Sequence, residues 1–150
     1  MSFIDTLIQN CHIAKSAIPV TVIEVDDLSA LDGLQKAIYI IEEVGDNPEE
    51  TFQTFSRYKA KKERACARLN APSAVLYVGS STTGVRKRIE QHLGRGNKGT
   101  YALHLSHWFS GQYKVTVKQY DVSDAVLQII EDDLSHTLKP AFGKQGGNNK

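Results

Sequence analysis

The sequence predicts a single domain of mixed α/β composition, of the α+β type, over residues 1–150. The main observation is the stretch 75–92, which reads VLYVGSSTTGVRKRIEQH. An apolar run typical of a strand is followed by a polar turn beginning at Gly79 and by a basic helix beginning at Gly84. The stretch 36–43, KAIYIIEE, predicts a second strand. A chain of 150 residues is long enough to bury one core of useful size.

The composition limits the classes of partner. The chain has 18 lysines and arginines against 17 aspartates and glutamates, so its formal net charge is only +1 and any nucleic-acid surface has to be local. Two cysteines, Cys11 and Cys66, are too few for a disulfide framework. No apolar run is long enough to cross a bilayer, and the N-terminus lacks the pattern of a signal peptide. We therefore expect a cytoplasmic protein without a membrane partner.

Residues 1–35 form an N-terminal extension in which we recognise no chemistry. Ser2, with Asp5 three residues later, predicts the start of a helix over residues 2–14. A short strand is expected over residues 20–25, and a helical turn follows Asp26.

A long helix is predicted over residues 48–70, PEETFQTFSRYKAKKERACARLN, because the segment has no internal glycine or proline. Its later turns are rich in cations, for which there are two interpretations. The cations either stabilise the helix by opposing the negative end of its dipole or form a face that binds the phosphates of a nucleic acid. Glu63 interrupts the basic run, which favours the stabilising role.

Three further segments complete the chain. The loop GRGNKGT (94–100) is either a DNA-contacting loop, through Arg95 and Lys98, or a plain connector. The segment TYALHLSHWF (101–110) predicts a helix, and residues 113–120 alternate as a strand. A last helix follows Ser123, and the tail 147–150 is expected to be disordered.

Glu131 is the strongest candidate that the residues themselves indicate. Apolar residues of the last helix form one stripe, and Glu131 falls inside it; these residues are Leu127, Ile130, Leu134 and Leu138. A lone carboxylate on a core-facing side is costly unless it is paired or bound to a cation. The alternatives are a buried ion pair with an arginine and a ligand of Mg²⁺, which commonly takes one or two carboxylates.

Arg86 and Arg88 lie in the first turns of the helix that follows Gly84. Cations there oppose the positive end of the helix dipole, so we interpret them as holding an anion. A planar bidentate cation suits a phosphoryl group better than lysine does, and either arginine can take that role. Lys87, on the surface of the same helix, is grouped with Arg86 among the cations that contact nucleic acid.

Tyr39 and Tyr77 lie in the two predicted strands. A phenol has a pKa of about 10 and is not a strong base by itself. Strand tyrosines are usually core residues with one bonded hydroxyl.

Together these residues resemble the GIY-YIG nuclease superfamily. The resemblance rests on AIY at 37–39, YVG at 77–79, the Arg-xxx-His pair of Arg88 and His92, and Glu131 on a late helix before Lys-Pro. It extends over residues 37–146. Two departures are Ala37 in place of the first glycine and the inserted helix 48–70 between the two tyrosine strands.

The resemblance implies a small three-stranded antiparallel sheet flanked by helices, with strands near Ile38, Leu76 and Val115. It also implies a metal-dependent endonuclease that hydrolyses phosphodiester bonds of DNA. Glu131 would hold Mg²⁺ or Mn²⁺ and Arg88 would neutralise phosphoryl charge, while the remaining site residues, Tyr39, Tyr77 and His92, would position or deprotonate the attacking water.

The cations expected to contact DNA are Lys61, Lys62, Arg64, Arg86, Lys87, Arg95 and Lys98. The sequence contains no separate DNA-recognition domain, so specific cleavage of a long site requires a homodimer or a separate targeting partner. The alternatives are a non-cleaving binding module of the same fold, for nucleic acid or protein, and an RNA-directed nuclease.

Overall fold

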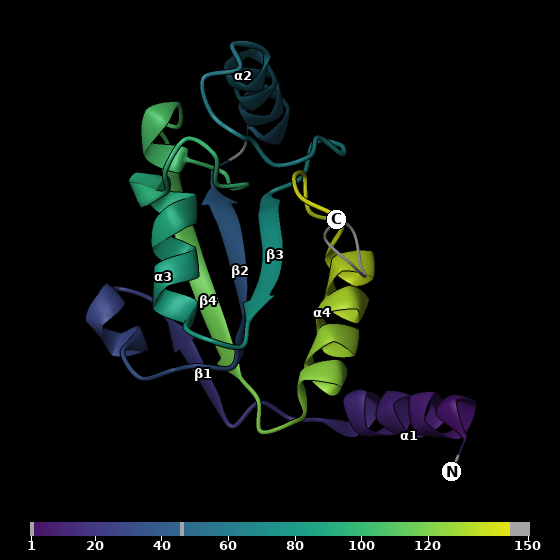
Figure 1. The fold of residues 1–150 in the computed structure, drawn as a ribbon. Coiled ribbons are helices and arrows are strands. Elements are labelled where there is room, and N and C mark those ends of the chain that lie inside the picture. The colour runs from purple at the N-terminus through teal and green to yellow at the C-terminus, as the bar shows by residue number, and fades with distance from the viewer. Residues whose placement is uncertain (1, 46, 145–150) are drawn as a thin grey trace.

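The computed structural model describes residues 2–45 and 47–144, and the predicted disordered tail lies outside them. Within these ranges the chain forms four α-helices, a four-stranded sheet and short 3₁₀ and π turns (Figure 1). The helices are α1 (Phe3–Ser16), α2 (Pro48–Ala60), α3 (Val85–Glu90) and α4 (Asp124–Leu138). The strands are β1 (Thr21–Glu24), β2 (Ala37–Val44), β3 (Val75–Ser81) and β4 (Gln112–Gln119).

All strands of this sheet are antiparallel to their neighbours, in the order β1-β4-β2-β3. The predicted α+β class and antiparallel pairing are confirmed, but the predicted number of three strands is wrong. The fourth strand is β1, which pairs with β4 along the edge that β2 leaves free, with Val22 opposite Lys118. Unpaired N–H and C=O groups along that edge of β4 provide the physical reason for the extra strand. The N-terminal extension is therefore part of the sheet.

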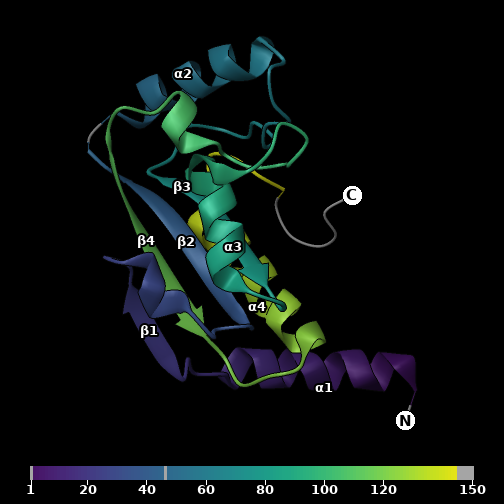
Figure 2. The same ribbon diagram turned by 60° about the vertical axis from the view of Figure 1, so that its left-hand side comes forward.

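The sheet separates two cores, because side chains alternate between its faces along each strand. Along β2, Tyr39 and Ile41 face the core that includes Ile89 of α3 and Phe55 of α2. The opposite core is formed by apolar residues of β2, β3 and α4, which are Ile38, Ile40, Val78, Val126, Leu127 and Ile130. Helices α3 and α4 therefore cover opposite faces of the sheet (Figures 1 and 2). Residues 37–41 of β2 are buried on both faces, and this part of the strand is accordingly a continuous apolar run.

The inserted helix is shorter than predicted. Helix α2 ends at Ala60, and the predicted continuation to residue 70 is wrong. Lys62 adopts a left-handed backbone with φ 57°, which turns the chain. The backbone of Ala65 and Ala67 then donates to Lys98 and Ala102. These bonds to a distant loop compete successfully with the local helical bonds that propensity favours.

Two other local predictions differ from the structure. Strand β3 continues through the turn predicted at Gly79 and ends at Ser81, because Gly79, Ser80 and Ser81 all pair with β2. Of the helix predicted over residues 101–110, only the 3₁₀ turn Leu105–His107 forms. His104 precedes it with a left-handed φ of 53°, and its Nε2 contacts the carbonyls of Ala65 and Thr100.

The first and last helices begin where the sequence predicts. Ser2 and Asp5 form both hydrogen bonds of a capping box at the start of α1. Ser123 caps α4 by accepting a hydrogen bond from the backbone of Val126. None of the described helices is long and apolar enough to cross a membrane.

Candidate active site

Three of the predicted site residues form a buried aromatic cluster on the α3 face of the sheet. The rings of Tyr39 and Tyr77 are nearly parallel, with an interplanar angle of 4° and centroids 6.1 Å apart. The His92 ring lies 4.1 Å from the Tyr77 ring and 5.5 Å from the Tyr39 ring, centroid to centroid. All three side chains are almost completely buried. Strands β2 and β3 bring the tyrosines together, and the π turn Gln91–Arg95 that continues α3 adds the histidine.

Both nitrogens of His92 have a partner, and the two partners determine where its proton lies. The backbone N–H of Leu103 donates to Nδ1 at 3.1 Å, so Nδ1 carries a lone pair. Burial, together with the charge of Arg88, places the pKa of His92 well below its ordinary value of 6.5. The neutral ring therefore has its proton on Nε2, which donates to the Tyr39 hydroxyl at 3.0 Å. In this arrangement His92 orients Tyr39 and has no free lone pair with which to act as a base.

Gly79 makes room for the Tyr39 ring. The two residues are directly opposite each other on β3 and β2. A Cβ atom on Gly79 would lie 2.4 Å from the Tyr39 hydroxyl oxygen and 2.6 Å from Cζ. Gly143 has the same relation to Tyr77. A Cβ atom on Gly143 would lie 2.7 Å from Cε2 of Tyr77, and Gly143 also has a left-handed φ of 97°. Each phenol ring thus packs directly on a glycine backbone.

Arg88 links the tyrosine cluster to the loop that follows α3. Its guanidinium donates to the carbonyl oxygen of Tyr101 at 2.8 Å and to Oε1 of Gln91 at 3.0 Å. Its charge and hydrogen bonding also act to lower the pKa of both Tyr39 and Tyr77. The Arg88 residue as a whole is partly exposed.

The two phenols remain protonated despite Arg88. Burial is the largest influence on both groups; it raises the pKa of Tyr77 to about 12 and raises that of Tyr39 still further above its ordinary value of 10. The charge of Glu131 acts in the same direction on both hydroxyls. At neutral pH these tyrosines are therefore hydrogen-bonding groups and not bases.

Glu131 is 5% exposed, as its place within the apolar stripe of α4 predicts. Its Oε1 accepts a hydrogen bond from the Ser80 hydroxyl at 2.5 Å. Burial raises the pKa of the carboxyl group, and hydrogen bonds from Ser80 and Gln128 partly oppose that shift. None of the ion pairs found among residues 2–45 and 47–144 includes Glu131. In this part of the chain, the carboxylate is held by neutral donors.

Strand β3 separates Glu131 from the aromatic cluster. Ser80 faces α4, whereas its neighbour Gly79 faces the Tyr39 ring, because adjacent residues of a strand point to opposite faces. Strand β3 is an edge strand, and residues 141 and 142 pair only with its beginning, at Val75 and Leu76. The Glu131 carboxylate and the aromatic cluster therefore lie on opposite faces of β3, whose outer backbone edge receives hydrogen bonds from residues 141 and 142 only at Val75 and Leu76 among the described residues.

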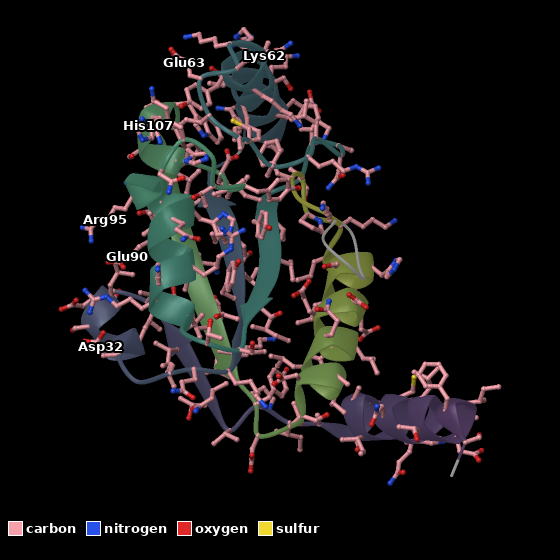
Figure 3. All side chains as sticks on the ribbon, in the orientation of Figure 1. Asp32, Lys62, Glu63, Glu90, Arg95 and His107 are labelled. Carbon is pink, nitrogen blue, oxygen red and sulfur yellow. The ribbon has the colours of Figure 1, made fainter. Side chains whose placement is uncertain are left out.

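The seven cations predicted to contact DNA fall into three groups. Arg86 pairs with Asp32 at 2.6 Å and with Glu90 at 3.6 Å, and Arg95 pairs with Glu90 at 2.9 Å. Figure 3 labels three of these side chains, Asp32, Glu90 and Arg95. Lys62, Arg64 and Lys98, together with Lys59 and one acidic residue, Glu63, line an open hollow of about 560 Å³ between the end of α2 and the loop 94–100. Lys61 and Lys87 are exposed.

The structure adds contact residues that sequence reasoning missed. Ser80 holds Glu131, while Gln91 and the Tyr101 carbonyl hold Arg88. Ser80 could have been found from the sequence: with the strand extended past Gly79, it falls on the same face as Val78. A backbone carbonyl such as that of Tyr101 gives no signal in a sequence.

No group of three or more histidine, cysteine, aspartate or glutamate side chains in the described ranges is placed to hold a metal ion. Comparison with protein-family models, with curated proteins and with solved structures finds no match.

Proposed function

We propose that this protein is a metal-dependent endonuclease that hydrolyses phosphodiester bonds of DNA, with a site of the GIY-YIG type. The observation that carries the proposal is the buried Glu131 carboxylate, which the Ser80 hydroxyl and Gln128 hold beside the edge of β3 without a charged partner among the described ion pairs. Burying a carboxylate costs free energy, and the surrounding stripe of leucine and isoleucine does not offset that cost. A bound cation would offset it.

A single carboxylate beside a hydroxyl fits a largely hydrated Mg²⁺ or Mn²⁺ ion, which keeps several waters and takes few protein ligands. Glu131 would be its protein ligand, and Ser80 would fix the orientation of the carboxylate. Such an ion supplies Lewis acidity at a phosphoryl oxygen. Without the ion, the buried carboxyl group has a raised pKa, so loading with a cation and loss of its proton are expected to occur together.

Arg88 is proposed to bind the reacting phosphate. The Tyr101 carbonyl and Gln91 fix its guanidinium, so little reorganisation is needed when negative charge develops on the phosphoryl oxygens. Loss of one preorganised donor of this kind typically costs about 3–4 kcal/mol of transition-state stabilisation.

The tyrosines are proposed to position water and phosphate as neutral donors. Tyr39 accepts a hydrogen bond from His92, which leaves its own O–H proton free for donation. The general-base role that the resemblance allows for His92 is therefore replaced in our proposal by a positioning role.

The basic hollow is the proposed path for the rest of the DNA strand. Its Lys98 lies three residues before Tyr101, the residue whose carbonyl holds Arg88. The loop 94–100 thus connects the hollow to the reacting phosphate, which favours its interpretation as a DNA-contacting loop. Arg86 and Arg95 are weaker candidates because their charges are already paired with Asp32 and Glu90.

A non-cleaving binding module is the second candidate, and the burial of the phenols favours it. Tyr39 and Tyr77 are 1% and 4% exposed, so a substrate has little direct access to their hydroxyls unless neighbouring groups move. In such a module Arg88 and the basic hollow would bind nucleic acid without hydrolysis.

The test is Glu131→Gln, with Asp133→Asn as the matched control because Asp133 lies exposed on the same helix. Nicking of supercoiled plasmid, branched DNA and structured RNA is measured with Mg²⁺ and with EDTA, and DNA binding is measured in parallel. We expect Glu131→Gln to abolish nicking and retain binding, while Asp133→Asn stays active. Equal nicking by both variants contradicts the proposed role of Glu131. Wild-type protein that binds but does not nick indicates the binding module, and preference for RNA indicates an RNA-directed nuclease.

A further inference from the structure

The first 22 residues carry most of the exposed apolar surface. Ten large apolar side chains are exposed among the described residues, and eight of them belong to α1, β1 and their connection. These eight are Phe3, Ile4, Leu7, Ile8, Ile13, Ile18, Val20 and Val22. Phe3 is 77% exposed and Ile4 is 65% exposed, values that are unusual for two neighbouring large side chains on one helix. Such a concentration is typical of a surface that binds another molecule.

Helix α1 is only partly packed against its own chain. Towards its C-terminus, Ala14 packs against the core cluster that includes Ile130 of α4. The same stripe continues along Ile4, Leu7 and Ile8, which line an apolar hollow on the surface of α1. Both views show the N-terminal part of α1 extending away from the sheet and past the beginning of α4 (Figures 1 and 2). The overhanging part has no cover within the described chain.

The polar face of α1 argues against a lipid surface. Helices that lie on membranes carry lysines and arginines along the polar face. Helix α1 has one acidic residue, Asp5, and one basic residue, Lys15. A protein surface with matching polar groups is a better chemical fit than an anionic bilayer.

We propose that the overhanging stripe of α1 pairs with α1 of a second copy, in an antiparallel arrangement about a two-fold axis near Ile8. Helical periodicity places Asp5 and His12 on the same flank of the stripe, two turns apart. An antiparallel pair centred between Ile8 and Gln9 sets Asp5 of each copy opposite His12 of the other, where an imidazole N–H donates to a carboxylate. In a parallel two-fold pair the same flank of the two helices lies on opposite sides of the seam, so Asp5 and His12 would not meet. Of the two isologous arrangements, the antiparallel pair is therefore the one that joins these two groups.

The first test is the oligomeric state, measured by sedimentation equilibrium of the full chain, whose mass is 16.6 kDa. We expect a dimer in the wild type and a monomer for the double variant Ile4→Asp, Leu7→Asp, with a dissociation constant raised roughly a hundredfold or more by the loss of two buried apolar side chains. Tyr113→Ser is the matched control, since Tyr113 is exposed elsewhere on the surface, and it should remain dimeric. Circular dichroism verifies that α1 is intact in each variant.

The second test identifies the face of α1 that forms the contact. In a Cys11→Ser background, Ile8→Cys should form an intermolecular disulfide because it lies near the axis, whereas Ile13→Cys, on the other side of the helix, should not. A wild-type monomer at all concentrations overturns the proposal, as does a dimer that is insensitive to the double variant or cross-linked equally at both positions. Binding of the monomer to vesicles of anionic lipid, abolished by the double variant, would assign the stripe to a membrane and would equally overturn it.

Discussion

Substitution of Gly79 by alanine tests the packing at the centre of the candidate site. The new Cβ would lie 2.4 Å from the Tyr39 hydroxyl oxygen and 2.6 Å from Cζ, well inside van der Waals contact. The far end of a flexible side chain could move away, but this ring is rigid, 1% exposed and stacked beside Tyr77. Gly79 also lies within the β2–β3 ladder, so its backbone is fixed by pairing with Tyr39. The clash therefore cannot be relieved locally.

The magnitude follows from two terms. Overpacking of a well-packed core typically costs about 1–3 kcal/mol. Displacing the Tyr39 hydroxyl also breaks its 3.0 Å contact with His92 and leaves a buried N–H without a partner, which costs about 1–3 kcal/mol more. We expect Gly79→Ala to lower the free energy of unfolding by about 2–6 kcal/mol. For a domain of 150 residues this corresponds to a fall in Tm of roughly 4–24 °C.

Urea denaturation followed by circular dichroism measures this change. Gly99→Ala is the matched control, because its Cβ would make only an ordinary contact of 3.8 Å with Asn97, and it should stay within about 1 kcal/mol of the wild type. In a Tyr39→Leu background, which removes the ring, the added cost of Gly79→Ala should largely disappear. A Gly79→Ala protein as stable as Gly99→Ala would refute the placement of the Tyr39 ring over this glycine.

Three further predictions concern protonation and charge. The His92 ring is expected in the neutral form with its proton on Nε2, and ¹⁵N NMR should detect this tautomer without a titration near 6.5; a proton on Nδ1 would contradict the assigned hydrogen bonds. Burial raises the pKa of Glu131 above 4.5, so the folded protein holds the carboxyl proton more tightly than the unfolded chain does. In EDTA, the stability of the wild type relative to Glu131→Gln should therefore be constant below pH 4.5. It should fall as the pH rises through the raised pKa of Glu131. Urea denaturation of both proteins across this range measures the difference, and a difference that increases with pH would show that the carboxylate is stabilised by folding. In the basic hollow, Lys62→Ala and Lys98→Ala should each reduce the slope of log K for DNA against log salt concentration by about one, whereas Lys15→Ala on α1 should leave the slope unchanged.

Much of the candidate site is readable from local sequence patterns. The helical stripe containing Glu131 predicts its burial, because a 3.6-residue period alone decides which side of α4 faces the core. Apolar runs identify β2 and β3, and the Ser2–Asp5 spacing predicts the start of α1 because capping uses only neighbouring residues.

Tertiary contacts decided the features that depend on distant segments. Helix α2 stops at Ala60 because backbone bonds to the loop 94–102 replace local ones, and propensity contains no information about that partner. In the same way, β1 joins the sheet because β4 offers a free edge, and Ser80 meets Glu131 because β3 continues past Gly79. The proton position on His92 depends on the backbone N–H of Leu103, a group that every residue except proline carries. Local periodicity thus determined which side chains turn inward, whereas their partners were set by backbone groups brought from far along the chain.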